Sequence, residues 1–374
     1  MAVVAFEALA DELKGLMSLG VARELDDEAF NDLALRVFHY QHRTNATYRR
    51  FADARGAGPD RVRHWTEIPS VPTTAFKHMR LVSGDPSSVQ EVFRTSGTTS
   101  GEARRGEHAV VDLNLYRSSL LPTFRWHVLP DGERPRILSL VPPLSDRSDS
   151  SLGFMIQVVI EELGREGSGW FVDSRSGLRE DALFDAFREA EAANAPVLLV
   201  STSLGLVHWM DAMDRRGWRV RLPGGSRVMD TGGFKGRSRT VSRSTLYAGL
   251  HERIGVPSSS MINEYGMTEL LSQFYEPVLR EGEAKGGLTG RRLVGPPWVR
   301  TRVLDPGELR PVPPGEEGVL CHLDLANLGS VAHVLTEDRG VDVEGGFRVL
   351  GRAIGAPARG CSLAMDEMIE AGRG

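Results

Sequence analysis

A segment rich in hydroxyl side chains and glycine is the first part of the sequence that could do chemistry. It has the sequence TSGTTSG from Thr95 to Gly101 and follows the apolar pair Val92-Phe93. Glycine lets the backbone approach a ligand closely, and hydroxyls together with amides can surround phosphate oxygens. The segment has no lysine, which excludes a Walker-type loop. The residues alone leave two interpretations open, a phosphate-binding loop and a surface turn.

A second segment, NEYGMTE, runs from Asn263 to Glu269 and places a threonine and two glutamates around a glycine. Thr268 could contact a phosphate and Glu269 could bind Mg²⁺, because carboxylates and phosphates are the usual ligands of that ion. Tyr265 could stack on a planar ring. The alternative is a polar loop that caps a helix beginning at Glu269.

Two further segments carry charged residues next to glycines. Residues 229–236, MDTGGFKG, run from a strand-like stretch into paired glycines, where a ligand can lie against the backbone, and include Lys235. Residues 335–340, LTEDRG, include Asp338, whose carboxylate could bind ribose hydroxyls. Arg352 follows and could bind phosphate or the same ribose. Taken alone, each segment is more typical of an exposed turn than of a site.

The composition of the chain excludes several classes of protein. Its 374 residues are 41% hydrophobic and 25% charged, which indicates a globular protein of two or three structural units. The net charge of −5 gives no support to nucleic-acid binding. There is no run of about 18 apolar residues, so we expect no membrane span. Residues 1–17 predict an amphipathic helix instead of a signal peptide, and we therefore expect a cytoplasmic protein.

Cysteine and lysine are both scarce, and this shortens the list of candidate nucleophiles. The two cysteines have no metal-ligand spacing. Cys321 lies in the apolar run GVLCHLDL and is predicted to be a buried packing residue. Cys361 lies in the polar run RGCSLAMDE and is, on composition alone, an ordinary thiol. The four lysines are Lys14, Lys77, Lys235 and Lys285.

The elements that must position these segments alternate between strands and helices, which predicts an α/β fold with a largely parallel sheet. Residues 64–77 contain two prolines and predict an extended connector. After about residue 286 the pattern predicts a smaller antiparallel part. The predicted strands are 136–142, 169–173, 195–202, 219–222 and 226–233. The predicted helical segments are 5–52 (with Asp26 or Asp27 as a cap), 110–129, 153–163, 179–193, 204–216 and 365–371.

In their order along the chain, TSGTTSG, the Gly-Gly turn, EYGMTE, TEDRG and a later Gly-Arg pair resemble the adenylate-forming (acyl-CoA synthetase) superfamily. The chain is more closely similar to the LuxE-like acyl-protein synthetases, which are long-chain-fatty-acid–protein ligases. The segments that carry this resemblance are IPSVPTTAFKH (68–78), FRTSGTTSG (93–101), DTGGFKGR (230–237), NEYGMTELLSQFY (263–275) and RGCSLAMDE (359–367).

The resemblance implies roles for individual residues. Glu269 would hold Mg²⁺, Thr268 would contact the α-phosphate of ATP, and Cys361 would accept the acyl group. Arg352 would lie beside the ribose. The remaining residues implied to bind ATP are Thr95, Ser96, Gly97, Thr98 and Thr99 at the β- and γ-phosphates, Gly232 and Gly233 at the adenine and acyl pocket, Tyr265 and Gly266 near the adenine and α-phosphate, and Asp338 at the ribose.

The same resemblance implies the domain organisation. It indicates the large domain of an adenylate-forming enzyme, with mostly parallel sheets flanked by helices and a smaller antiparallel β subdomain. We expect this domain at residues 1–349 and a short segment after the hinge at 350–374, which carries Cys361. Only 22 residues follow Arg352 and none is lysine, so we expect the full C-terminal domain, with its catalytic lysine, to be lacking. Lys235 is the candidate to replace that lysine.

The implied activity has two half-reactions and needs ATP and Mg²⁺. A carboxylic acid, in this family a fatty acid, would form an acyl-adenylate, and Cys361 would then take the acyl group as a thioester. Arg352 and Arg359 could lower the pKa of that thiol. A fatty-acid reductase would be the partner that accepts the acyl group. Residues 139–156 and 200–210 would line the acyl pocket.

Two alternatives remain at this level. One is an acid:CoA ligase, or an enzyme that transfers the acyl group to a free carrier thiol. The other is a non-catalytic nucleotide-binding subunit, against which the intact TSGTTSG and EYGMTE segments argue. Phe154, Met155 and Trp209 favour an apolar acid.

Overall fold

The structure is a computed structural model that divides into two compact units. It describes all residues except 1–4, 97–104, 174, 233–240, 353–363, 366 and 372–374. Unit 1 comprises residues 1–123, 267–273 and 294–374, and unit 2 comprises residues 124–266 and 274–293. No helix in the described part of the chain is long and apolar enough to cross a bilayer.

Unit 2 is built on a six-stranded sheet with the strand order β11-β10-β9-β8-β4-β5. All neighbouring strands are parallel except β10 and β11. The central strand β8 is almost completely buried, as its uninterrupted apolar sequence predicts for a sheet covered on both faces. The strands are β4 (Arg136–Ser139), β5 (Gly169–Trp170), β8 (Val197–Thr202), β9 (Arg227–Thr231), β10 (Met261–Tyr265) and β11 (Phe274–Tyr275).

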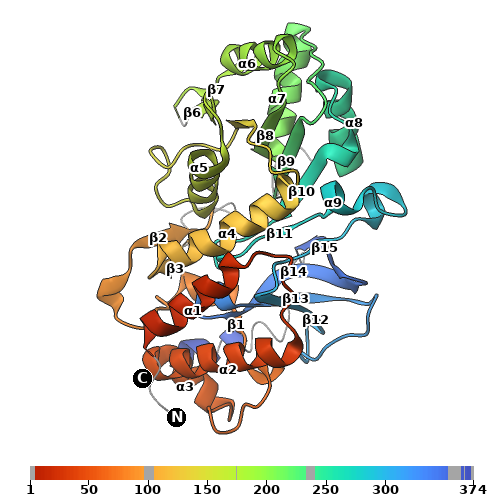
Figure 1. Ribbon diagram of the computed structural model, residues 1–374. Coiled ribbons are helices and arrows are strands. Elements are labelled where there is room, and N and C mark those ends of the chain that lie inside the picture. Colours follow the sequence, from red (N-terminus) through yellow and green to blue (C-terminus); the bar gives the residue numbers. More distant parts are fainter. Residues whose placement is uncertain are drawn as a thin grey trace. The chain divides into compact units, whose positions relative to one another are not determined.

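Helices follow the strands of unit 2 and surround its sheet (Figure 1), and three of them, α6, α7 and α8, share a buried apolar core with the strands. Helix α7 begins where β8 ends, because Thr202 accepts a hydrogen bond from the amide of Gly205 and caps it. It ends at Gly217, which has a φ of 65°. The helices are α5 (Ser151–Leu163), α6 (Glu180–Ala192), α7 (Ser203–Arg216), α8 (Arg243–Ile254) and α9 (Val278–Glu281).

Unit 1 contains a five-stranded sheet in which β14 pairs with β1, β13 and β15, and β13 pairs with β12. Only β1 is parallel to its neighbour. A separate antiparallel pair, β2 and β3, flanks residues 97–104. The strands are β1 (Val71–Pro72), β2 (Glu91–Arg94), β3 (Glu107–Val110), β12 (Val299–Leu304), β13 (Glu317–Asp324), β14 (His333–Val343) and β15 (Gly346–Arg352).

Helices α1 (Phe6–Ser18), α2 (Asp27–Thr44) and α3 (Ala46–Ala54) complete unit 1 at its N-terminal end. The predicted cap at Asp26 is confirmed, because its side chain accepts from the amide of Ala29 at 2.8 Å. Helix α4 (Leu113–Val128) carries the chain from unit 1 into unit 2. The predicted terminal helix is present at residues 364–365 and 367–371.

The α/β fold, with a mostly parallel sheet and a smaller antiparallel part, is confirmed. The predicted strand at 219–222 is wrong. Val220 and Leu222 donate their amide hydrogens to the carbonyls of Arg253 and Ile254 at the end of α8, so this stretch pairs with a helix terminus instead of a strand. The segment 169–173 divides into β5 and a short strand, β6 (Val172–Asp173), which pairs with β7 (Gly177–Leu178).

The segment 64–77 is also more ordered than the extended connector that its prolines predict. It forms two 3₁₀ turns, η1 (Trp65–Glu67) and η2 (Thr73–Lys77), on either side of β1. In η1 the Glu67 carboxylate accepts from the amide of His64 at 3.2 Å, and the His64 ring accepts from the amide of Thr66. Side-chain capping therefore supplies the bonds that a regular helix or strand would have supplied.

Candidate active site

Asp338 and Arg352 lie side by side in unit 1. They are register partners on the antiparallel strands β14 and β15, and Arg352 Nε is 3.5 Å from Asp338 Oδ1. Asp338 is buried and the Arg352 side chain is half exposed. Thr336 Oγ1 accepts from the amide of Asp338 at 3.1 Å and donates to the carbonyl of Leu320 at 2.8 Å. The structure thus brings together two residues that the sequence analysis placed at a ribose.

Thr268 and Glu269 lie in a turn on the segment 267–273 of unit 1. The helix that one interpretation placed after Glu269 is not formed, since the chain runs from this turn directly into β11. Glu269 is 7% exposed, and Asn327 Nδ2 donates to its main-chain carbonyl at 2.8 Å. The turn is therefore held by its backbone.

Asp324, at the end of β13, is the principal anchor of the segment 267–273. It accepts from the amides of Leu271 and Ser272 at 3.1 and 2.9 Å and from the Ser272 hydroxyl at 2.7 Å. Burial raises the pKa of Asp324 to about 6, and these donors act in the opposite direction. Asn327 Oδ1 also accepts from the Leu271 amide, at 3.1 Å. Neither anchor was predicted from the sequence. The position of Asp324 at the end of an apolar strand is the one signal that pointed to it.

His108, on β3, holds the same turn from another side. Its Nδ1 lies 2.7 Å from the carbonyl oxygen of Thr268. A carbonyl can only accept, so Nδ1 carries the proton. Burial lowers the pKa of His108 to about 4, and the ring is neutral at physiological pH.

Thr95 and Ser96 directly follow β2, at the start of the hydroxyl-rich segment. Thr95 donates its amide hydrogen to the carbonyl of Gly106 at 3.0 Å, and its Oγ1 accepts from the Gly106 amide at 2.9 Å. These bonds extend the pairing of β2 and β3 by one residue. The predicted phosphate-binding residues Gly97, Thr98 and Thr99 lie outside the described residues.

In unit 2, two predicted site residues lie at the carboxyl ends of neighbouring parallel strands. Gly232 directly follows β9, and Tyr265 is the last residue of β10. The register pairs Thr231 of β9 with Glu264 of β10, and the Thr231 hydroxyl donates to the Glu264 carboxylate. Ligands of open α/β sheets bind at the carboxyl ends of the strands, which is where Gly232, Tyr265 and the following Gly266 lie. Gly233 and Lys235 lie outside the described residues.

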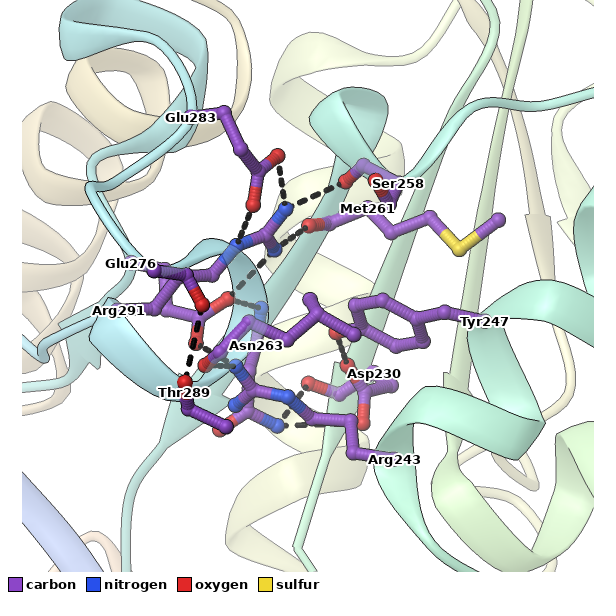
Figure 2. A network of polar contacts seen from close by, with 12 residues as sticks. Asp230, Arg243, Tyr247, Ser258, Met261, Asn263, Glu276, Glu283, Thr289 and Arg291 are labelled. Atoms are coloured by element: carbon purple, nitrogen blue, oxygen red, sulfur yellow. Dashed lines mark hydrogen bonds and ion pairs between the residues drawn. The ribbon is translucent and has the colours of Figure 1, made fainter.

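Asp230 is fully buried beside this edge and accepts from three donors, of which Figure 2 labels Tyr247 and Asn263. The Tyr247 hydroxyl is 2.6 Å away, the Ser203 hydroxyl 3.0 Å and Asn263 Nδ2 3.1 Å. Burial raises the pKa of Asp230, and the donors act against it. These contacts tie β9 to α8, to the first turn of α7 and to β10.

The same network continues through Glu276, which follows β11 (Figure 2). Arg243 and Arg291 both form ion pairs with its buried carboxylate, Arg291 at 3.0 Å. Arg291 also pairs with Glu283 at 2.7 Å and donates to the carbonyl of Met261 at 2.8 Å. A buried carboxylate needs such partners to remain charged. The network fixes the ends of β10 and β11 and the residues that follow them.

The predicted lining of the acyl pocket, residues 139–156 and 200–210, lies in unit 2. Trp209 is completely buried and packs against Phe187 and Trp218, at ring distances of 5.6 and 6.2 Å, in the core of unit 2. Phe154 and Met155 are buried as well. A cavity of about 440 Å³ in unit 2 has a mostly polar lining: Pro143, Ser145, Asp146, Gln157, Glu161, Trp170, Val172, Asp173 and Arg179.

The two cysteines differ in what the structure describes. Cys321 is completely buried on β13, as predicted, and its Sγ is 3.2 Å from His333 Nε2. His333 Nδ1 donates to the carbonyl of Ile68 at 2.7 Å, so Nε2 is free to accept from the thiol. Cys361, the predicted acyl acceptor, lies outside the described residues, as does Arg359.

Among the described residues, no group of three or more histidine, cysteine, aspartate or glutamate side chains could hold a metal ion. A single carboxylate such as Glu269 is nevertheless a fitting donor for Mg²⁺ that arrives with ATP. Mg²⁺ commonly uses one or two protein carboxylates, and substrate phosphates and water supply the other ligands.

Comparison with known proteins shows the family to which the chain belongs. The family model described as "Acyl-protein synthetase, LuxE" matches residues 16–370. Two proteins named long-chain-fatty-acid–luciferin-component ligase, from Vibrio harveyi and Aliivibrio fischeri, are each 22% identical to this chain. The first alignment covers 97% of this chain and 95% of the relative, and the second covers 93% and 90%.

The fold is also shared with solved adenylate-forming ligases. An open conformation of 2-hydroxyisobutyryl-CoA ligase in complex with 2-HIB-AMP and CoA has a TM-score of 0.60 and 15% identity. That match covers 87% of this chain and 74% of the ligase. The post-adenylation state of the same ligase has a TM-score of 0.61 and 14% identity, covering 87% of this chain and 67% of the ligase. The chain belongs to the acyl-protein synthetase (LuxE) family and is an enzyme of the ligase class.

Proposed function

We propose that this acyl-protein synthetase family member uses ATP to activate a fatty acid and then carries the acyl group as a thioester on its own Cys361. The match of the family model over residues 16–370 is the observation that carries the proposal. The names of the two curated relatives, which specify a long-chain fatty acid and a luciferin component, support the choice of acid.

In the first half-reaction, a carboxylate oxygen of the acid attacks the α-phosphorus of ATP and pyrophosphate leaves. Thr268 contacts the α-phosphate, and Asp338 binds the ribose with Arg352 beside it. Glu269 would hold Mg²⁺, which when bound would neutralise phosphate charge. The turn that carries Glu269 is anchored through its main chain, which supports this role, because an anchored turn needs little reorganisation when its side chain binds an ion.

Further ATP contacts come from the glycine- and hydroxyl-rich segments. The β- and γ-phosphates are bound by the segment that starts with Thr95 and Ser96 and continues through residues 97–99. Gly232, Gly233, Tyr265 and Gly266 line the adenine and acyl region. Lys235 supplies the positive charge that adenylation needs.

In the second half-reaction, the Cys361 thiolate attacks the carbonyl carbon of the acyl-adenylate and AMP leaves. The acyl group is then passed to a partner protein such as a fatty-acid reductase. We place the partner in this role because the relatives are named as ligases of a luciferin component.

A pyrophosphate-release assay with a panel of carboxylic acids tests the first half. We expect release that depends on ATP and an apolar acid, and that falls when Lys235 is replaced by alanine. Mapping of a hydroxylamine-labile adduct after incubation with ATP and labelled fatty acid tests the second half. Cys361→Ser should abolish the adduct, whereas Cys321→Ser, the matched control, should retain it. AMP production that requires coenzyme A and ignores Cys361 would support an acid:CoA ligase instead.

A further inference from the structure

The buried imidazole of His108 in unit 1 lies where three segments from different parts of the sequence meet. His108 is on β3, whose pairing with β2 places it opposite Phe93 and beside the residues that precede and follow the hydroxyl-rich segment. It also contacts Thr268 of the EYGMTE segment and Phe76 of the IPSVPTTAFKH segment. The proposed reaction gives His108 and Phe76 no role of their own.

The hydrogen bond of His108 fixes its tautomer. Nδ1 lies 2.7 Å from the carbonyl oxygen of Thr268 and must carry the proton. Nε2 is therefore the unprotonated nitrogen. It is buried and has no hydrogen-bond partner among the described residues. A second proton on the ring would have no acceptor, so the ring remains a neutral donor to Thr268.

The plane of the ring is fixed by its neighbours. The Phe76 ring lies edge-on to the imidazole, with centroids 5.7 Å apart and an interplanar angle of 84°. Phe76 also packs against Gly106, where an added Cβ would meet Phe76 Cβ at 3.6 Å and Thr95 Cγ2 at 3.1 Å. Phe76 of the 68–78 segment thus packs against the imidazole that donates to Thr268.

The turn at Thr268 has different supports on its two sides. Asp324 and Asn327 hold the main chain after Thr268, at Glu269, Leu271 and Ser272. His108 is the described side chain that holds the carbonyl of Thr268 itself, and it comes from the β2–β3 pair that carries Thr95.

We propose that His108 is a positioning residue for adenylation, which sets the place of the Thr268 backbone relative to the β2–β3 pair through its Nδ1–H donor, with Phe76 holding the ring. The inference rests on the proposed function, in which Thr268 contacts the α-phosphate and the segment after Thr95 binds the other phosphates. Loss of the donor therefore alters ATP use and leaves the acid contacts intact.

Two variants separate the donor from the shape of the ring. His108→Phe keeps a ring without a donor, and His108→Asn supplies a side-chain N–H near the position of Nδ1. Initial rates of pyrophosphate release are measured with the fatty acid saturating and ATP varied, and then with ATP saturating and the acid varied. We expect kcat/KM for ATP to fall roughly 10- to 100-fold in His108→Phe. We expect His108→Asn to recover most of it and the KM for the acid to be unchanged in both variants.

His127→Phe is the matched control. His127 is a similarly buried histidine, and burial lowers its pKa to about 4. It stacks on Tyr275 in unit 2, and within the described part of the chain its ring nitrogens have no hydrogen-bond partner. Its replacement tests for general effects of losing a buried imidazole. We expect a change in unfolding free energy without a selective change in kcat/KM for ATP.

The tautomer can be checked in the unaltered protein, so the inference stays testable even if a variant fails to fold. Nitrogen-15 NMR of the histidine rings should show His108 protonated at Nδ1. A proton at Nε2, or a folded His108→Phe with wild-type kcat/KM for ATP, overturns the inference. If the wild-type chain releases no pyrophosphate with any acid, the proposed function fails first, and this role fails with it.

Discussion

Two buried aspartates, Asp324 in unit 1 and Asp230 in unit 2, do similar work with different partners. Asp324 accepts from three main-chain amides, those of Leu271, Ser272 and Ala326, and from one hydroxyl. Asp230 accepts only from side chains in the contacts described above, which come from three different elements. Each lies next to residues that we place at ATP.

The difference indicates how each region tolerates change. Main-chain donors are present whatever residues occupy the segment, so the turn held by Asp324 depends chiefly on Asp324 itself. The region around Asp230 depends on the identity of Tyr247, Ser203 and Asn263 as well. We therefore expect a single decisive position in unit 1 and a distributed, cooperative network in unit 2.

Acidification should produce the largest effect and should act mainly on unit 1. Burial lowers the pKa of His108 and His333 to about 4 and that of His322 to about 3, below the unfolded value of about 6.5. The contribution of these histidines to the free energy of unfolding is complete above pH 6.5. It is lost as the pH falls, because only the unfolded chain takes up the protons. Asp324, with a raised pKa of about 6, offsets part of this loss. The net loss from pH 7 to 5 is about 4 kcal/mol.

Unit 2 supplies the internal comparison for that measurement. Burial lowers the pKa of His127 to about 4, but burial also raises the pKa values of Asp230 and Glu276, which bind protons more readily in the folded state. Because these effects oppose each other, the stability of unit 2 should depend less on pH than that of unit 1. Hydrogen-exchange protection factors at pH 7 and 5 should fall more in β13 and β14 than in β8 and β9. Earlier loss in β8 and β9 would contradict the expectation.

Replacement of Asp324 by alanine should give the next largest effect. The amides of Ser272 and Ala326 would lose their acceptor, and the Leu271 amide would keep only Asn327 Oδ1. We expect a loss of about 3 kcal/mol of unfolding free energy. Urea unfolding measures this loss. Asp324→Asn keeps one acceptor oxygen and should lose less, and equal losses in the two variants would show that the amides find other partners.

The network around Asp230 should reveal itself in a double-mutant cycle. Asp230→Asn and Tyr247→Phe should each destabilise the chain by about 1–2 kcal/mol, and the double variant should lose less than both together. Strict additivity would remove the argument that unit 2 uses a cooperative network.

The smallest effects come from removing one hydroxyl at each aspartate. Ser272→Ala leaves Asp324 with its main-chain amide donors and should cost about 0.5 kcal/mol. Ser203→Ala removes one of the three donors named at Asp230 and should cost about 1 kcal/mol. The comparison is reversed if Ser272→Ala is the more damaging change, as measured by denaturant unfolding of both variants.

The local patterns of the sequence were sufficient for most elements of the fold. The apolar run that becomes β8, the helical period of α7 and the Asp26 cap all follow from neighbouring residues. The stretch 219–222 was wrongly predicted to be a strand. Its alternate amides donate to the last carbonyls of α8, which gives the same alternation as pairing with a strand. That partner lies more than 30 residues away, where no local rule reaches.

The candidate site also depends on contacts between residues that are far apart in the sequence. The sequence indicated Asp338 and Arg352 from type and order, and the structure places them on paired strands. Their supports could not be predicted. His108 reaches Thr268 across 160 residues, and Asp324 reaches Leu271 across 53, so only the tertiary fold defines these contacts.

The buried thiol of Cys321 can report local opening of the sheet in unit 1. With its hydrogen bond to His333 and no exposed surface, it cannot meet an alkylating reagent while β12, β13 and β14 remain paired. The rate at which this cysteine becomes labelled in native buffer therefore reports how often that sheet separates. Mass spectrometry of a peptide containing residue 321 measures this rate. The rate reports the opening of unit 1 without an engineered label.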